Sequence, residues 1–170
     1  MLSRPEFDRL FDTFNRVAWR LEIQGTYDEP EEREPLRRFL SGEPDDLEWM
    51  ADWFAWIRSI TEAGKRFERV RVVFDPMPDY QRFELGLLTV PAIEAGEDIR
   101  VLTADRAHEL EMPDHDFWLF DDARVARMHF GPDGVTGAEL LDDPTAVRPF
   151  LDVRDRAWDA AISYHEWTAQ

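Results

Sequence analysis

The chain has 170 residues, of which 44% are hydrophobic, and it carries a formal net charge of −17. This length and composition suffice for one substantial hydrophobic core, which argues against global disorder and predicts a single domain over residues 1–170. The charge disfavours direct binding to nucleic acids and anionic membranes and favours basic protein partners, although acidic surfaces also simply keep proteins in solution.

The chain lacks cysteine, so disulfides, cysteine-ligated metals and cysteine nucleophiles are excluded. No apolar run approaches the roughly 20 residues that a transmembrane helix needs. The first residues also lack the apolar centre of a signal peptide. We therefore expect a cytoplasmic location.

The first third of the chain is predicted to alternate between helices and a strand. Residues 3–6 match a capping box, and the helical spacing of apolar residues behind them predicts a helix over residues 4–17. Alternation predicts a strand at residues 19–23. An acidic, proline-containing segment follows, with a short helix at residues 35–40, and a wide apolar stripe predicts a buried helix at residues 46–63.

The middle of the chain is predicted to form two strands that flank a helix. The β-branched run at residues 70–74 predicts a central strand, and alternation predicts another at residues 98–102. Apolar residues between 80 and 88 suit a helix that Pro91 should stop or kink. A strand, helix and strand of this length indicate a right-handed parallel crossover.

The last third is predicted to begin with a three-stranded antiparallel meander. Alternating runs at residues 116–121, 124–130 and 135–141 are separated by Asp-Asp and Gly-Pro-Asp-Gly turn signals. Together with the crossover, this pattern predicts an α+β fold whose mixed sheet is packed by aromatic-rich helices.

A helix should follow the meander. Asp143 and Pro144 have the pattern of a helix start, with proline at the first helical position. We expect Pro149 to interrupt this helix and Asp152 to cap a final helical segment.

Charged residues within the apolar strands are the first candidates for a binding site. If the two central strands are neighbours, Arg71 and Arg100 could face one surface beside Asp98 and recognise a carboxylate or phosphate. The alternative, which also involves Arg69, is a ladder of arginines and acidic residues on a solvated sheet face.

Two further segments carry ligand-binding candidates. Tyr80, Arg82 and Glu84 follow the first central strand at its carboxyl end, where open α/β sheets tend to bind ligands. Asp121 and Asp122 lie at a predicted hairpin tip and could hold a divalent cation, but aspartate is also a common turn residue and no further ligand motif adjoins them.

Known catalytic and cofactor motifs are missing. The four histidines do not match a metal-binding pattern, no serine lies in a nucleophile elbow, and no phosphate- or dinucleotide-binding loop is present. The sequence therefore predicts no catalytic residue, metal site or cofactor. Trp49, Trp53 and Trp56 could form an interaction surface, although their helical spacing favours core packing.

The chain resembles, over about residues 7–162, a family of actinobacterial domains of unknown function. The resemblance is carried by the strings RVRVVFDPMPDYQRFEL, AGEDIRVL, DFWLFDD and DDPTAV…RDRAWDAA. It implies gene neighbours that are helix-turn-helix regulators of the xenobiotic-response-element type, and it implies no catalytic residues. The chain is also faintly similar to the ligand-sensing or partner-binding region of WhiJ-like regulators.

These observations leave three hypotheses for the function. The first is a non-enzymatic regulatory or interaction module that binds a basic helix-turn-helix protein or a small ligand. The second is a hydrolase- or nuclease-like enzyme, which requires residues 80–84, Arg100, Asp121 and Asp122 to converge on one cleft. The third is an antitoxin-like partner of a neighbouring protein.

Overall fold

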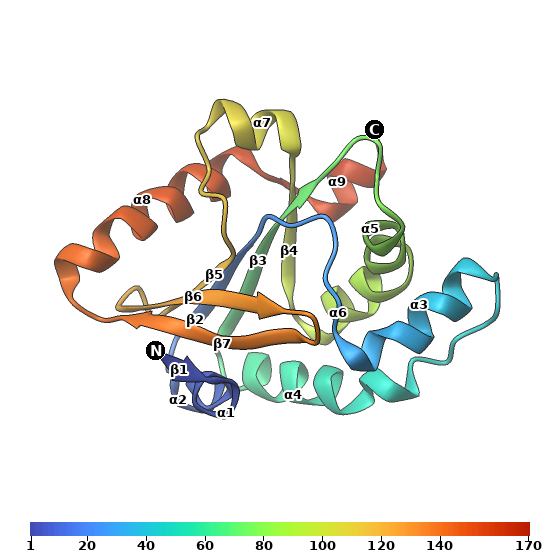
Figure 1. Cartoon of the computed structure of the whole chain (residues 1–170), viewed down its shortest axis with the longest axis horizontal. Helices are drawn as coiled ribbons and strands as arrows, with labels where there is room; N and C mark the ends of the chain where they lie inside the picture. The colour runs from blue at the N-terminus through green and yellow to red at the C-terminus, as the bar shows by residue number, and fades with distance from the viewer.

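The computed structural model describes all residues from 1 to 170 and contains eight strands. These are β1 (Leu2–Ser3), β2 (Val17–Glu22), β3 (Arg66–Val73), β4 (Asp98–Thr103), β5 (Phe117–Phe120), β6 (Arg124–Gly131), β7 (Gly134–Leu141) and β8 (Ile162–Ser163). They form one mixed sheet in the order β1-β7-β6-β5-β2-β3-β4-β8 (Figure 1).

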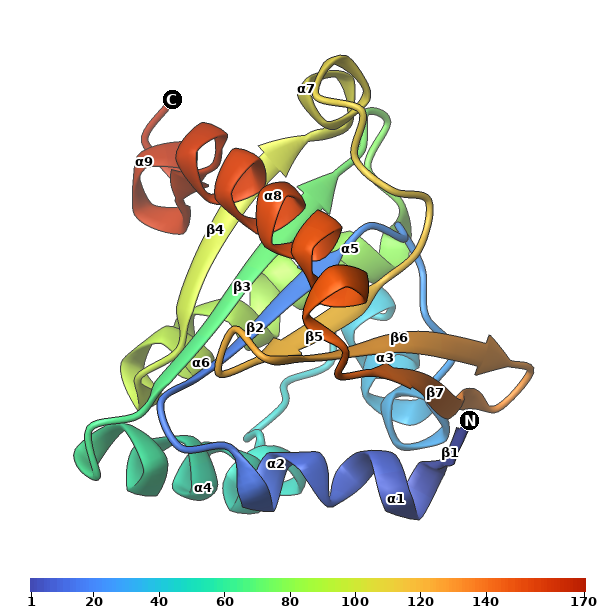
Figure 2. The same ribbon diagram turned by 90° about the vertical axis from the view of Figure 1, so that its left-hand side faces the viewer.

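Helices cover both faces of this sheet. They are α1 (Arg4–Asp8), α2 (Leu10–Thr13), α3 (Arg33–Leu40), α4 (Ala51–Glu62), α5 (Asp79–Phe83), α6 (Thr89–Ala95), α7 (Ala104–Glu109), α8 (Pro144–Ala160) and α9 (Tyr164–Thr168), with 3₁₀ turns η1 (Pro30–Glu32) and η2 (Glu48–Met50) and a π turn η3 (Glu84–Leu88). Figure 2 shows α8 across one face, with α5 and α6 behind the sheet. None of the helices combines the length and apolar character needed to cross a membrane.

The sheet confirms the predicted α+β class. Strands β3 and β4 are parallel and are connected through α5, η3 and α6, and β5, β6 and β7 form the antiparallel meander. Strand β2 also runs parallel to β3 while pairing antiparallel with β5, so it joins the two halves of the sheet. This central position of β2 did not follow from the sequence pattern.

The two faces of β2 enter two different cores because successive side chains of a strand point to opposite faces. Trp19 and Leu21 are fully buried in the core that α7 and α8 cover. Ala18 lies in the second core, which α1, α2, α4 and α6 cover. Arg20 and Glu22 share that second face, where they meet the site described below.

The predicted helix over residues 4–17 is wrong in its second half. The helical segment ends at Thr13, Phe14 has an extended backbone, and Val17 already belongs to β2. Val17 pairs with Arg66 of β3 and its side chain is buried. Sheet pairing therefore overrides the helical spacing of apolar residues in this segment.

The predicted helix at 46–63 begins later than expected, at Ala51. The carboxylate of Asp45 accepts the backbone N–H of Leu47 at 2.8 Å, and Leu47 has a left-handed φ of 59°. This local turn is followed by η2, so the regular helix starts only after it.

The predicted interruption at Pro149 is also wrong, and Pro91 does not stop its helix. Pro149 lies inside the uninterrupted helix α8, and Asp152 forms an i,i+4 pair with Arg148 instead of capping a new segment. Pro91 lies within α6, which follows directly on the π turn η3. A proline near the start of a helix removes only one backbone donor, which the remaining hydrogen bonds and tertiary packing can offset.

Candidate functional site

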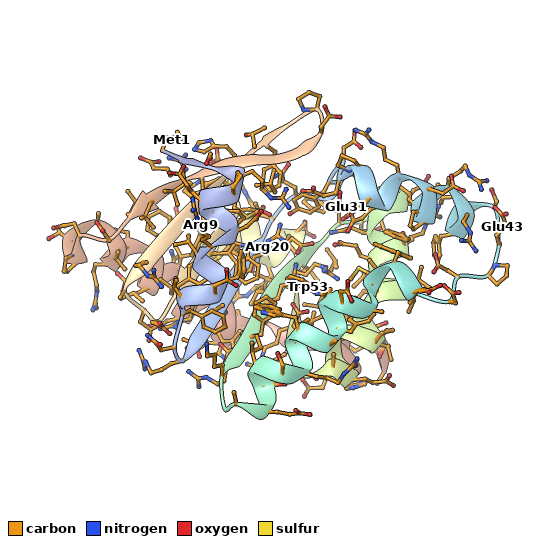
Figure 3. The ribbon with its side chains drawn as sticks, turned by 90° about the horizontal axis from the view of Figure 1, so that it is seen from below. Met1, Arg9, Arg20, Glu31, Glu43 and Trp53 are labelled. Carbon is orange, nitrogen blue, oxygen red and sulfur yellow. The ribbon has the colours of Figure 1, made fainter.

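A cavity of about 720 Å³ lies between the sheet and the helices of its second face. Its lining comes from α1, α2, the segment before α3, η2, α4, the α5–η3–α6 segment and strands β2 to β7. Figure 3 shows Arg20 between α1–α2 and α4, with Trp53 beside it on α4 and Glu31 on the segment that precedes α3. The volume falls within the range of about 300–1,000 Å³ that is typical of small-molecule sites.

Charged residues of β2 and β3 form the floor of the cavity. The parallel register pairs Arg20 with Arg69 and Glu22 with Arg71, which places all four side chains on one face. Glu22 is 1% exposed and lies 2.6 Å from Arg69, 3.0 Å from Arg71 and 3.7 Å from Arg20. One carboxylate thus holds three guanidinium groups together.

Each arginine of the floor also has a second acidic partner. Arg20 donates to Asp116 at 2.8 Å and Arg69 donates to Glu97 at 2.7 Å. Arg71 lies 3.2 Å from Glu84. The guanidinium charges are therefore compensated by protein carboxylates and are not free for an anionic ligand.

The two glutamates beside Arg71 have opposite pKa shifts. Burial alone would raise the pKa of Glu22, but the guanidiniums of Arg71, Arg20 and Arg69 together lower it below its usual range. Burial raises the pKa of Glu84 well above its usual range, and Arg71 offsets this only in part. The floor therefore combines a firmly ionised carboxylate with one that favours its neutral form.

Two buried polar atoms next to the cavity have no hydrogen-bond partner. They are Oε2 of Glu84 and Nε of Arg20, and both residues line the cavity. Leaving a buried polar group unpaired costs about 1–3 kcal/mol, so such atoms are uncommon in a folded protein. They are the positions at which a bound molecule would gain hydrogen bonds.

A second pair of polar residues lies at the side of the cavity. Tyr80 donates from its hydroxyl to the carboxylate of Glu32. Burial raises the pKa of Glu32 to about 6, while the hydrogen bond from Tyr80 acts in the opposite direction. Glu32 therefore changes its charge near pH 6.

Aromatic side chains form the wall opposite the charged floor. The rings of Trp53 and Trp56 lie 5.2 Å apart, and Phe11 contacts Trp56 edge to face at 6.2 Å. Trp49 and Trp118 also line the cavity. Trp53 and Trp56 are half-buried, so they pack on the core and line the cavity at the same time.

Arg71, Tyr80 and Glu84 are the predicted site residues that line this cavity. Arg82 is exposed and pairs with Asp79 instead.

The predicted arginine cleft does not form, because Arg71 and Arg100 lie on opposite faces of the sheet. The register of β3 and β4 pairs Arg100 with Val70, which places it on the face of α8, and its guanidinium stacks on Trp158 at 3.6 Å. The alternative prediction was a ladder of arginines and acidic residues on a solvated sheet face. Arg69 and Arg71 do belong to such a ladder, but it is buried.

Asp121 and Asp122 form the tip of the β5–β6 hairpin, away from the cavity lining. Both have positive φ angles, of 56° and 60°. The carboxylate of Asp121 accepts the backbone N–H groups of residues 15, 16 and 17, and that of Asp122 pairs with Arg154 at 2.8 Å. No group of three histidine, aspartate or glutamate side chains is placed to hold a metal ion.

Within the charged floor, the sequence did not single out Arg20, Glu22 and Glu97. In β2 the charged residues alternate with Trp19 and Leu21, which is also the pattern of a strand with one solvated face. The only available signal was the presence of charges of both signs on neighbouring strands, and it depended on the unforeseen pairing of β2 with β3.

A comparison with curated proteins gave no match. A comparison with protein families gave a match over residues 5–169. The chain belongs to the family described as a domain of unknown function, DUF6879.

Proposed function

We propose that this protein is a non-enzymatic regulatory module that binds a small organic molecule in its central cavity. The observation that carries the proposal is the cavity of about 720 Å³, which combines an aromatic wall with a buried charged floor. Small-molecule sites have this composition, in which apolar side chains provide contact area and a few polar groups fix orientation.

The geometry supports binding in preference to catalysis. The enzyme hypothesis requires Tyr80, Glu84, Arg100 and Asp121 to converge, but the last two lie away from the cavity. Within the cavity, the arginines are bound to carboxylates and lack a free charge with which to stabilise a transition state.

A thermal-shift screen of small organic compounds tests the proposal. We expect some compounds to raise the midpoint of unfolding in a saturable way, because a ligand that binds only the native state stabilises it. Trp53→Ala should abolish this shift, since it removes part of the aromatic wall, whereas Trp167→Ala should preserve it, since Trp167 does not line the cavity. Failure of every compound, or equal shifts in both variants, would contradict the proposal.

The net charge of −17 supports a second form of the proposal, in which the module binds a basic helix-turn-helix protein. In this form, the protein lies in the cytoplasm and its partner is an actinobacterial regulator. Affinity capture from an actinobacterial lysate should recover such a regulator at low salt and lose it as salt rises. Capture that recovers no basic protein at low salt would argue against this form.

A further inference from the structure

The charges around the cavity indicate which chemical class of ligand it accepts. The acidic residues that line it are Asp8, Glu22, Glu29, Glu31, Glu32, Asp52, Glu84 and Glu97, and the basic ones are Arg4, Arg20, Arg69 and Arg71. Acidic side chains thus outnumber basic ones, and a charged cleft of this kind raises the local concentration of ions of the opposite sign.

The arginines of this lining all pair with protein carboxylates, and Nε of Arg20 is the one buried guanidinium donor among them without a partner. The three arginines of the floor pair with acidic residues as described above, and Arg4 at the rim lies 2.9 Å from Asp8 and 3.6 Å from Glu29. An anionic ligand would therefore have to displace an existing ion pair and would leave a carboxylate without its partner.

Several of the carboxylates, by contrast, lack a basic partner. Glu31, Glu32 and Asp52 form no salt bridge. The Glu84 side chain is 8% exposed and pairs with Arg71, yet its Oε2 atom has no hydrogen-bond partner. This buried, unpartnered carboxyl oxygen is the second and independent observation that points to a hydrogen-bonding ligand, and a cationic head group beside it would favour the ionised form of Glu84.

The aromatic wall suits the same kind of ligand. A cation within about 6 Å of a tryptophan face is attracted by the ring quadrupole, and this attraction adds to the contact area that the rings provide. In this protein Trp53 and Trp56 lie on the same helix as Asp52, so an aromatic surface adjoins an unpaired carboxylate.

We infer that the cavity binds an organic cation, with a positively charged nitrogen head group and a flat apolar body. The head group lies against the unpaired carboxylates and the body lies against Trp53 and Trp56. This inference rests on the proposed function, because it names the ligand class of the same cavity. It replaces the carboxylate or phosphate ligand that the sequence pattern suggested for the arginines.

Three naphthalene compounds with different head groups test the inference: naphthylmethylammonium, naphthylmethanol and naphthoate. Binding to the full-length protein is measured by calorimetric titration at low salt. We expect the ammonium compound to bind at least about tenfold more tightly than the other two. Tighter binding of the alcohol or the carboxylate, abolished by Trp53→Ala, would overturn the cation inference while leaving the cavity as a ligand site. No binding of any of the three would count against the proposed function itself.

Two double variants distinguish the effect of charges in the cavity lining on binding from the effect of the net charge of the protein. Glu31→Gln with Asp52→Asn removes two unpaired carboxylates from the lining, and Asp114→Asn with Asp159→Asn makes the same change in net charge at exposed sites outside it. In titrations at about 0.15 M salt, we expect the first variant to weaken ammonium binding by about fivefold or more and the second by less than about twofold, since distant exposed charges are screened. Equal effects of the two variants would overturn the inference.

Discussion

Glu22 is the residue on which the interior of this protein depends most directly. It is buried on a central strand and contacts Arg20, Arg69 and Arg71. Moving charges out of water is costly, and the cost is offset only when every charge keeps its partners. The cavity floor is therefore stable as a complete network and unstable when its central carboxylate is removed.

Glu22→Gln should lower the free energy of unfolding by about 3–5 kcal/mol, because it leaves buried guanidinium charges without compensation. Urea denaturation measures this change. Glu34→Gln is the control, since it removes an exposed carboxylate that pairs with Arg37 and should leave the stability nearly unchanged. A Glu22 variant as stable as the Glu34 variant would contradict this account of the network.

The raised pKa of Glu32 predicts how the stability of the protein depends on pH. Its pKa is raised from 4.5 to about 6 in the folded protein, so the folded state binds this proton more tightly than the unfolded state. The contribution of Glu32 to stability therefore falls as pH rises from about 4.5 to 6, by up to about 2 kcal/mol in total.

Glu32→Gln removes this titration and can still accept the hydrogen bond from Tyr80. Relative to the wild type, the variant should gain up to about 2 kcal/mol in free energy of unfolding between about pH 4 and about pH 7. Urea denaturation at the two pH values checks this. The same stability difference at both pH values would show that Glu32 is not perturbed.

At the scale of elements, helix α8 shows that a single residue can predict where a helix begins and still fail to predict where it ends. Asp143 caps it as predicted, accepting the N–H groups of Thr145 at 2.9 Å and Ala146 at 3.2 Å. Pro149, however, is exposed within the helix and does not break it. The apolar face that α8 packs on the sheet outweighs the local preference of one proline.

Pro149→Ala should therefore raise the free energy of unfolding, by up to about 3 kcal/mol, because alanine restores a helical donor and suits the helix interior. Pro144→Ala is a matched control at the first helical position, where proline is well tolerated and replacement should change little. Thermal denaturation compares the two. A destabilised Pro149 variant would mean that the proline is required for the shape of α8.

A substitution in the β5–β6 hairpin tests whether Asp121 has a structural role in the turn or belongs to a metal site. Asp121 ties the start of β2 to this hairpin through backbone hydrogen bonds, so Asp121→Ala should cost about 1–3 kcal/mol of stability. The cost should be the same in the presence of Mg²⁺ and of a chelator. Stabilisation of the wild type alone by the metal would instead support a cation site at the tip.

At the scale of the whole molecule, the fold class could be predicted but the cavity could not. Alternation and turn residues identified the meander, and the strand–helix–strand spacing identified the parallel crossover, because both are local patterns. The floor of the cavity instead depends on the register between β2 and β3, whose residues are about fifty positions apart. The sequence pattern identified Arg71 as a candidate but not Glu22, although the two form a buried ion pair.

The central claim is that the cavity is a binding site, and the tryptophans report on it directly. Of the seven tryptophans, Trp49, Trp53, Trp56 and Trp118 line the cavity, and Trp19, Trp158 and Trp167 do not. The most direct test is an NMR titration that follows the indole N–H signals as naphthylmethylammonium is added. The account predicts saturable shifts of the cavity signals with the other three nearly unmoved. Unchanged signals throughout, or shifts confined to the tryptophans outside the cavity, would contradict it.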